Sequence, residues 1–247
     1  MTLSGRFAAA AGSVTGREHR RAERDGQDGY GLVATDRVVA AIVTDGCSSG
    51  RRSEIGARVG AGWLAALVEQ RFAEVRDAQD AVRLAGDVTR ELLVRLGLLA
   101  RSLDAAGDVV AARIDESLLF GFLAAVVTAE TTIVFGVGDG IVVVDGEITS
   151  IDPGPDNAPP YVAYGLLDAA AARAAPRVHF VGPTAEIDTV AVATDGLAPV
   201  APTLATLAGD PRYAVNPSLL RKRLVVLSDG GTFSDDATVA VVRRRPR

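Results

Sequence analysis

The chain has 247 residues, of which 48% are hydrophobic and 23% are charged, and its net charge is −5. This is ordinary globular composition, and the length is sufficient to bury a sizeable core. The acidic balance excludes a global positive field for binding nucleic acid or an anionic membrane surface, and the single cysteine excludes an internal disulfide.

The longest apolar stretch, residues 118–129, is interrupted by Gly121 and is shorter than the roughly 20 residues that a membrane-spanning helix needs. The apolar stretch at residues 7–11 is too short for the hydrophobic region of a secretion signal. We therefore expect a cytoplasmic protein with neither membrane nor nucleic acid as a partner. Two histidines and one cysteine are too few to favour a zinc site.

The first half of the chain predicts a hairpin followed by two helices. Residues 30–44 contain two apolar runs that flank a turn at residues 36–37, which is typical of a hairpin. Residues 53 to about 75 have apolar side chains at roughly helical spacing, and a second helix is expected from residue 77 to about 103. The expected apolar face of the first helix consists of Ile55, Val59, Trp63, Leu67 and Phe72.

From residue 117 onwards, β-branched residues separated by turn residues predict strands. We expect these strands at residues 118–128, 131–137, 141–144, 147–151, 177–181, 189–193 and 237–242. Short helices are expected around Leu204 and Leu219. Runs of strands and runs of helices, rather than strict alternation, favour an α+β fold, and we expect residues 1–247 to form a single domain.

Acidic residues stand at the ends of three predicted strands. Two apolar strands run directly into Thr-Asp-Gly, at Asp45 and at Asp195, and the pair Asp235-Asp236 immediately precedes the last strand. Seven Asp-Gly pairs occur in the chain, and each alone is typical of a turn. Repetition of the whole strand-Thr-Asp-Gly unit is harder to explain by turns, and carboxylates held at strand ends could converge on hard cations.

An ordered set of motifs, rather than any single one, identifies a family resemblance. The motifs are residues 16–19, 26–28, 43–57, 136–140, 156–161, 193–196 and 235–238. In this order they resemble the metal-dependent PP2C family of serine/threonine protein phosphatases, in its shorter bacterial branch. The resemblance implies a four-layer α-β-β-α sandwich, in which two antiparallel sheets are flanked by helices.

The resemblance also implies a two-metal centre for Mn²⁺ or Mg²⁺ at one end of the sandwich. By position, Asp45 would bridge both ions and take part in catalysis, and the carbonyl of Gly46 would bind one of them. Asp195 and Asp235 would complete the ligands of the other ion. Asp28 would act through a metal-bound water.

A third metal site is incomplete by the same comparison. Where the family has an aspartate four residues after the Asp of the second Thr-Asp-Gly, this chain has Pro199. Asp139 matches the partner carboxylate of that site. We therefore expect two ions, with Asp139 as an additional acidic ligand.

The chain departs from the family at two positions that handle the substrate. Better-known members have a phosphate-binding arginine where this chain has Glu23, and Arg20, Arg21 or Arg24 could substitute for it. Many members also have a proton-donating histidine directly after the first Asp-Gly, where this chain has Cys47.

His19 is the available replacement for the proton donor, and a structural role for it is the alternative. The segment at residues 156–161 is either a loop over the active site or a passive connector. Proline-rich loops are usually connectors, but this segment also matches the family.

Three functions remain open at this stage. The first is hydrolysis of phosphoserine or phosphothreonine in a phosphorylated protein by a metal-activated water. The second is a non-catalytic regulatory or binding domain, because both substrate-handling residues are displaced. The third is an aspartyl-phosphate enzyme with Asp45 as nucleophile, although such enzymes need Asp-x-Asp and Gly46-Cys47 follows here. The sequence leaves the oligomeric state open.

Overall fold

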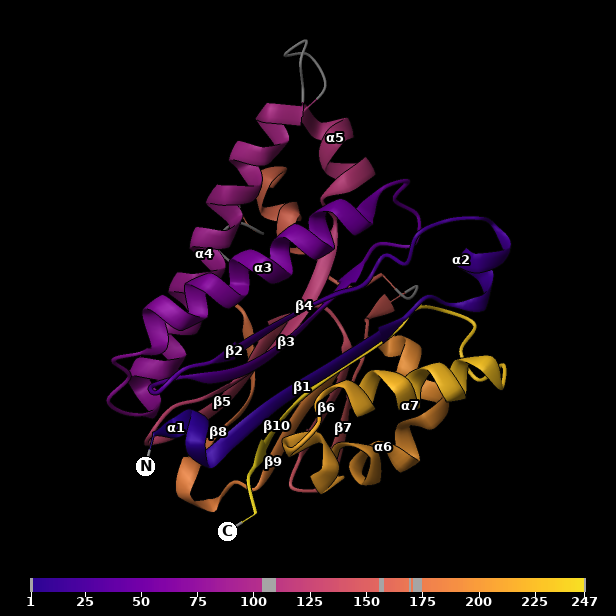
Figure 1. Cartoon of the computed structure of the whole chain (residues 1–247). Helices are drawn as coiled ribbons and strands as arrows, with labels where there is room; N and C mark the ends of the chain where they lie inside the picture. The colour runs from indigo at the N-terminus through magenta and orange to yellow at the C-terminus, as the bar shows by residue number, and fades with distance from the viewer. Residues whose placement is uncertain (1, 104–109, 156–157, 169, 171–174, 247) are drawn as a thin grey trace.

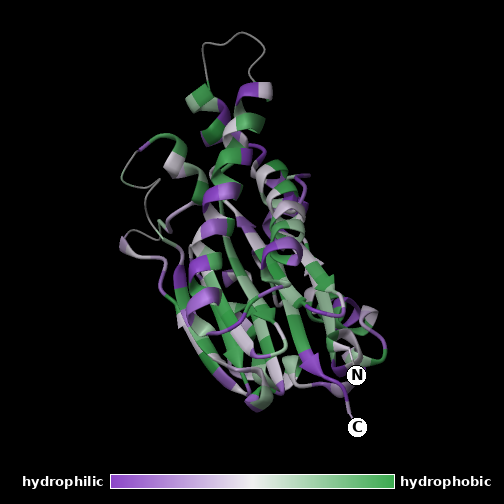
Figure 2. Cartoon of the chain, turned by 90° about the vertical axis from the view of Figure 1, so that its left-hand side faces the viewer, coloured by the Kyte–Doolittle hydropathy of each residue, from purple (hydrophilic) through white to green (hydrophobic). Residues whose placement is uncertain are grey.

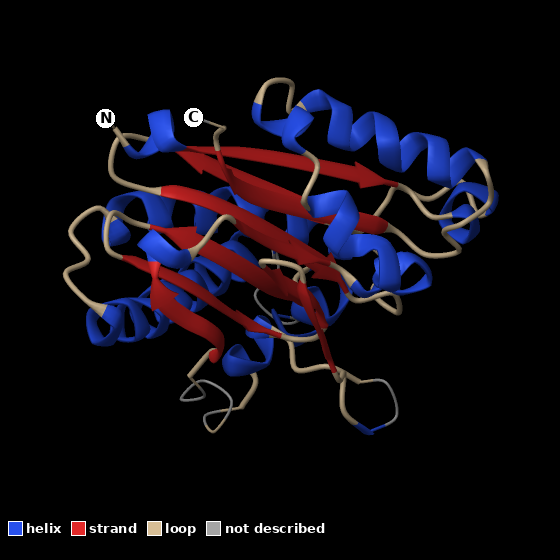
Figure 3. Ribbon diagram, turned by 90° about the horizontal axis from the view of Figure 1, so that it is seen from below, coloured by secondary structure: helices blue, strands red, loops and turns tan. Residues whose placement is uncertain are grey.

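The protein is a sandwich of two antiparallel five-stranded sheets with helices on both outer faces (Figures 1 and 3). The computed structural model describes residues 2–103, 110–155, 158–168, 170 and 175–246. The order of layers is helices, sheet, sheet, helices, which confirms the four-layer α+β fold expected from the sequence.

One sheet has the strand order β2-β3-β4-β5-β8 and is built mainly from sequence neighbours. Its strands are β2 (Gly29–Ala34), β3 (Val39–Gly46), β4 (Phe120–Val127), β5 (Thr131–Val137) and β8 (Arg177–Pro183). The second sheet has the order β1-β10-β9-β6-β7 and brings the two ends of the chain together. Its strands are β1 (Phe7–Val14), β10 (Ala237–Arg244), β9 (Thr189–Ala193), β6 (Gly140–Val144) and β7 (Glu147–Ile151).

Successive residues of the central strands are buried in different layers of the sandwich. In β3, Ala40 and Ile42 contribute to the core beneath the helices, whereas Val39, Ala41 and Val43 contribute to the core between the sheets. This follows from the two-residue period of a strand, and it explains why such strands are apolar along their whole length. Figure 2 shows the resulting hydrophobic strands, with helices that are hydrophilic on part of their surface.

Two long helices cover the first sheet, and two shorter ones cover the second (Figure 1). The long helices are α3 (Ser53–Phe72) and α4 (Ala78–Leu103), followed by the short α5 (Val110–Ser117). The helices over the second sheet are α6 (Ala201–Ala208) and α7 (Ser218–Asp229). These positions confirm the helices predicted from the sequence.

The buried face of α3 agrees with the predicted one in the second half of the helix, where Leu67 and Phe72 are fully buried, and differs from it in the first half. Ile55, Val59 and Trp63 are only partly buried, whereas small residues occupy the face against the sheet. The fully buried small residues of α3 are Gly56, Ala57, Gly60 and Ala61. A Cβ on Gly56 would lie 2.7 Å from the Cα of Leu118. Close approach of backbones therefore selects the buried face in the first half of α3, and burial of large apolar side chains selects it in the second half.

The sequence pattern does not predict β1, nor the short helices α1 (Leu3–Arg6), α2 (Arg17–Arg21) and α5. The β1 segment is rich in alanine, which has weak strand propensity. It is a strand because it pairs with β10 along its whole length, from Phe7 opposite Arg244 to Val14 opposite Ala237. Among the residues that the structure describes, no helix is both long enough and apolar enough to cross a membrane.

Candidate functional site

A small acidic pocket lies where several strands of the two sheets end, at the same end of the sandwich. Asp45 is near the end of β3, Asp195 follows β9, and Asp235 precedes β10. Asp139 lies in the turn between β5 and β6, and Asp28 immediately precedes β2. Antiparallel pairing places these strand ends together, since Ala193 of β9 lies opposite both Val239 of β10 and Ile141 of β6.

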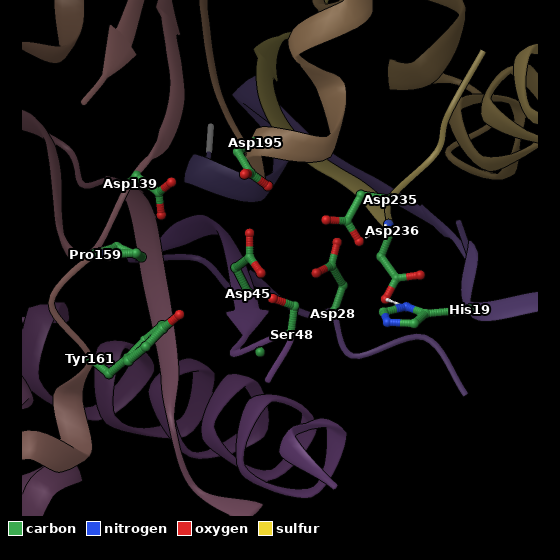
Figure 4. Close-up of a pocket in the computed structure, with 11 residues that line it drawn as sticks. His19, Asp28, Asp45, Ser48, Asp139, Pro159, Tyr161, Asp195, Asp235 and Asp236 are labelled. Atoms are coloured by element: carbon green, nitrogen blue, oxygen red, sulfur yellow. Dashed lines mark hydrogen bonds and ion pairs between the residues drawn. The ribbon is translucent and has the colours of Figure 1, made fainter. Parts of the chain in front are cut away.

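The pocket has a volume of about 80 Å³ and combines acidic residues from distant parts of the chain (Figure 4). Its lining residues are His19, Asp28, Asp45, Gly46, Ser48, Asp139, Pro159, Tyr161, Asp195, Asp235 and Asp236. The structure thus brings together the whole set of acidic residues that the sequence singled out.

Asp28 is held deep in the wall of this pocket. Its side chain is buried, and its Oδ2 accepts a hydrogen bond of 2.9 Å from the Thr194 hydroxyl. Burial and the neighbouring charge of Asp236 raise the pKa of Asp28 well above its usual value. The protein therefore holds a carboxylate at a position that disfavours its charge.

Asp45 lies among other carboxyl groups. Burial raises the pKa of Asp45 well above its usual value, and the charges of Asp28, Asp195 and Asp139 raise it further. Burial and Asp195 likewise raise the pKa of Asp139 to about 6. These carboxyl groups lie around one space (Figure 4), and a bound cation would relieve their mutual repulsion.

The two adjacent aspartates before β10 have different partners. Asp236 is buried, and it accepts hydrogen bonds from the backbone N–H groups of Gly16 (2.7 Å) and Gln27 (2.6 Å). It also contacts Nδ1 of His19 at 2.8 Å. Asp235 accepts a bond only from the backbone N–H of Asp236 within the described residues, and its side chain stays available to the pocket.

His19 lies on α2, at the side of the pocket formed by Asp235 and Asp236 (Figure 4). Its ring is about nine-tenths buried, with 11% of the side chain exposed. Because a carboxylate accepts the hydrogen at Nδ1, Asp236 orients the ring and leaves Nε2 as its second polar atom. His19, Asp235 and Asp236 each offer one ligand atom within 4.8 Å of the others, but His19 and Asp236 already bond to each other.

The family model for protein phosphatase 2C matches residues 15–231. The chain belongs to the protein phosphatase 2C family. This is a family of protein serine/threonine phosphatases. The match confirms the resemblance that the ordered motifs indicated. No curated protein matches the chain.

Solved structures of bacterial phosphatases have the same fold. The Mycobacterium tuberculosis serine/threonine phosphatase PstP/Ppp is 17% identical, with a TM-score of 0.61 over 98% of this chain and 100% of that chain. Stp1 from Staphylococcus aureus is 16% identical, with a TM-score of 0.62 over 98% and 97%. The catalytic domain of PstP in complex with two manganese ions is 16% identical, with a TM-score of 0.63 over 98% and 99%. At these identities the likeness shows the fold alone.

The arginines expected to bind phosphate in this PP2C-family chain do not line the pocket. Arg20 instead donates a hydrogen bond to the Ser228 hydroxyl on α7 (2.9 Å), and Arg24 donates to the carbonyl of Gly50 (2.8 Å). Arg21 is exposed. The structure therefore does not support the expectation that one of these three arginines would bind the substrate phosphate. Arg20 and Arg24 instead stabilise neighbouring segments.

The sequence assigns no individual role to two pocket residues with hydroxyl groups, although both lie in segments that resemble the family. Ser48 follows Cys47 in the loop after β3, and Tyr161 follows the proline-rich loop after β7. The loop over residues 156–161 thus reaches the pocket through Pro159 and Tyr161, whereas residues 156 and 157 lie outside the described residues. An aromatic residue ending a proline-rich loop was the one available signal.

The donor set of the pocket fits hard divalent cations. Its acidic groups offer only oxygen, which Mg²⁺ and Mn²⁺ prefer, and the single histidine of the lining is engaged by Asp236. The residues that could hold such ions are Asp28, Asp45, Gly46, Asp139, Asp195 and Asp235. Their mutual repulsion in the absence of a cation is consistent with this fit.

Proposed function

We propose that the chain is a metal-dependent phosphoprotein phosphatase that hydrolyses phosphoserine or phosphothreonine monoesters at a two-metal centre. The observation that carries this proposal is the convergence of Asp28, Asp45, Asp195 and Asp235 in one pocket of a PP2C-family fold. The four residues come from segments far apart in the sequence. If each aspartate served only to form a local turn, the four would have no reason to lie in one pocket. Phosphorylated proteins are the proposed partners, and the cytoplasm is the expected location.

The acidic residues would share the metal ligation. Asp45 faces three other carboxyl groups, which suits a bridging ligand between two ions. The carbonyl of Gly46 would join it, while Asp195 and Asp235 would hold the second ion. Asp28 is fixed by Thr194 and would act through water. Asp139 would add a further ligand next to Asp195.

When bound, a pair of divalent cations supplies a water nucleophile at neutral pH and neutralises charge on the phosphoryl group. The carboxylates that would bind the cations are anchored at strand ends, so their positions are fixed. His19, oriented by Asp236, would give a proton to the departing serine or threonine oxygen. Buried Asp236 would keep the histidine in that position.

The test is hydrolysis of p-nitrophenyl phosphate and of a phosphoserine peptide by the purified chain with Mn²⁺, with Mg²⁺ and with chelator. We expect turnover that depends on the metal and that Asp45→Asn abolishes. Asp229→Asn is a matched control, because Asp229 also precedes a glycine but is exposed at the end of α7. Equal loss in both variants would argue against a specific role for Asp45.

The main alternative is a non-catalytic domain on the same fold. Retention of every carboxylate expected at the two-metal centre argues against it, because a domain without metal chemistry gains nothing from carboxyl groups that repel one another. Metal binding without turnover in the same assay would favour this alternative. A covalent phospho-enzyme would instead point to Asp45 as a nucleophile.

A further inference from the structure

Tyr161 presents its hydroxyl to the acidic pocket from the side opposite His19. Figure 4 shows the phenol directed toward Asp45 and Ser48, with His19 beyond Asp28. Tyr161 stands at the start of the 3₁₀ helix η2 (Val162–Leu166), and this helix packs against α4. The side chain therefore belongs to an ordered part of the wall.

The ring of Tyr161 is held by its neighbours. It packs edge-to-face against Tyr164, with ring centres 5.4 Å apart and planes at 62°. It also contacts the core beneath α3 and α4, in which Val162 and Ala163 are buried. A side chain fixed in this manner can present a polar atom with little loss of conformational entropy.

The hydroxyl is a donor rather than a source of charge. Burial, the Cys47 thiol and the charge of Asp45 all raise the pKa of Tyr161, so the phenol stays protonated. The hydrogen bond of the Cys47 thiol is with the Ser49 hydroxyl, 3.0 Å away. A thiol is a weak acceptor and a phosphoryl oxygen is a strong one, so the phenol would donate to a bound phosphate in preference to Cys47.

The pocket has few other groups that can donate to phosphate. Among the described residues that line it, the donating side chains are His19, Ser48 and Tyr161, and none is an arginine or a lysine. His19 is engaged by Asp236, and Ser48 is exposed on the loop after β3. His19 is held by Asp236 and proposed above for the leaving oxygen, so Tyr161 is the fixed donor that remains for a non-bridging oxygen.

We propose that the Tyr161 hydroxyl donates a hydrogen bond to a non-bridging phosphoryl oxygen of the bound substrate. It would provide part of the phosphate contact that an arginine provides in better-known relatives. This inference rests on the proposed phosphatase function, because it concerns the phosphate at the same site.

The first experiment measures binding of inorganic phosphate to the Mn²⁺-loaded chain by calorimetry. Tyr161→Phe removes only the hydroxyl, and we expect phosphate to bind about 10-fold more weakly, as for loss of one hydrogen bond to a charged group. Mn²⁺ affinity, measured separately, should be unchanged. Tyr164→Phe is the matched control, because Tyr164 belongs to the same aromatic pair but does not line the pocket.

A second variant, Cys47→Ala, tests whether Tyr161 binds phosphate directly or only supports the loop that carries Cys47. If Tyr161 acted only by holding the thiol, Cys47→Ala would weaken phosphate binding as much as Tyr161→Phe. We expect Cys47→Ala to weaken it less. Equal phosphate affinity in wild type and Tyr161→Phe, or equal losses in Tyr161→Phe and Cys47→Ala, would overturn the proposal.

Turnover measurements then show whether Tyr161 contacts a non-bridging oxygen or the leaving oxygen. A bond to a non-bridging oxygen predicts the same loss of kcat/KM for p-nitrophenyl phosphate and for phenyl phosphate. A much larger loss with phenyl phosphate, which has the poorer leaving group, would move the contact to the leaving oxygen and overturn the proposal. If wild type binds phosphate through Tyr161 but turns over neither ester, the phosphatase function fails while this contact stands.

Discussion

The hydroxyl of Thr194 donates a hydrogen bond of 2.9 Å to Oδ2 of Asp28, so the second Thr-Asp-Gly segment fixes the carboxylate that precedes β2. Thr194 also accepts a bond from the backbone N–H of Thr238 on β10 (3.0 Å). Thr44 occupies the same place in the first Thr-Asp-Gly, but it donates to the carbonyl of Ala57 on α3 (2.9 Å). Two identical motifs therefore do different work: one orients a carboxylate and the other anchors a helix.

Thr194→Val should lower both stability and metal affinity. The substitution keeps the shape but removes a buried hydroxyl, which leaves Asp28 without its donor and costs about 1–3 kcal/mol of unfolding free energy. Thr44→Val should cost stability to a similar extent without weakening Mn²⁺ binding. Urea denaturation and Mn²⁺ titration of the two variants check this. Equal Mn²⁺ affinity in both would show that Thr194 does not position Asp28.

Substitution of Asp236 should mainly lower stability, whereas substitution of Asp235 should mainly abolish activity. Asp236→Asn removes a buried charge that accepts from Gly16, Gln27 and His19, so we expect a loss of about 3 kcal/mol or more in unfolding free energy. Asp235→Asn should leave the metal-free protein at least as stable, because it reduces repulsion with Asp195 and Asp236. It should still abolish metal-dependent turnover.

Chemical denaturation without metal and activity with Mn²⁺ together test this pair. A large stability loss in Asp235→Asn with activity retained would reverse the two roles. Such a result would make Asp236 the metal ligand.

The acidic pocket was predictable because its residues mark strand ends in short-range patterns. Asp45 and Asp195 stand at the ends of apolar strands, where a rigid sheet can hold a carboxylate. Their strands β3 and β9 belong to different sheets, so the two residues meet because the sheets pack face to face. The sequence did not predict in the same way that Asp236 has a structural role while Asp235 faces the pocket. The partners of Asp236 lie more than 200 residues away in the sequence, at Gly16 and Gln27.

Packing explains the other differences between sequence and structure. The buried face in the first half of α3 depends on how closely its glycines approach the segment that leads into β4, and a hydrophobic pattern carries no information on this distance. Likewise, β1 has a weak intrinsic preference for strand and depends on pairing with β10 at the other end of the chain. Tyr161 precedes η2, whose packing on α4 and β4 connects residues far apart in the sequence.

His19→Gln should slow turnover in a manner that depends on the leaving group. If His19 gives a proton to the departing oxygen, kcat should fall roughly 100-fold for phenyl phosphate and much less for p-nitrophenyl phosphate, whose leaving group needs little help. His179→Gln is the control, since His179 lies on β8 and does not line the pocket. A uniform loss across both esters would indicate a structural role for His19.

The metal-free protein should become less stable as the pH rises from about 4 to about 6. Burial and like charge raise the pKa of Asp45 and Asp28, and they raise that of Asp139 to about 6. The folded state therefore keeps these protons at pH values where the unfolded chain, with aspartate near about 3.9, has lost them. Their contribution to stability is complete below the unfolded pKa and is lost as the pH rises through the folded pKa.

Thermal denaturation in chelator across this range measures the effect, with Asp45→Asn as comparison. The variant should show a shallower decline, because one of the repelling carboxylates is gone. Mn²⁺ should stabilise wild type most above about pH 6, where metal no longer competes with protons. Identical pH slopes for wild type and variant would show that repulsion at Asp45 does not limit stability.

Two glycines of α3 should respond to alanine in opposite directions. A Cβ on Gly56 would lie 2.7 Å from both the Cα of Leu118 and the carbonyl oxygen of Ser117, and backbone atoms cannot move aside cheaply. Gly56→Ala should therefore cost about 1–3 kcal/mol by overpacking. A Cβ on Gly62 would meet nothing within 4 Å, so Gly62→Ala should stabilise by up to about 1 kcal/mol through helix propensity.

Urea midpoints of the two variants test whether backbone proximity determines how α3 packs. The displacement in Gly56→Ala would also reach the site, because Leu118 leads into β4, where Phe120 pairs with Gly46 at the edge of the pocket. We therefore expect Gly56→Ala to reduce Mn²⁺-dependent turnover and Gly62→Ala to preserve it. Stabilisation by both substitutions would mean that α3 is free to shift over the sheet, and that its glycines do not set the position of the metal ligands.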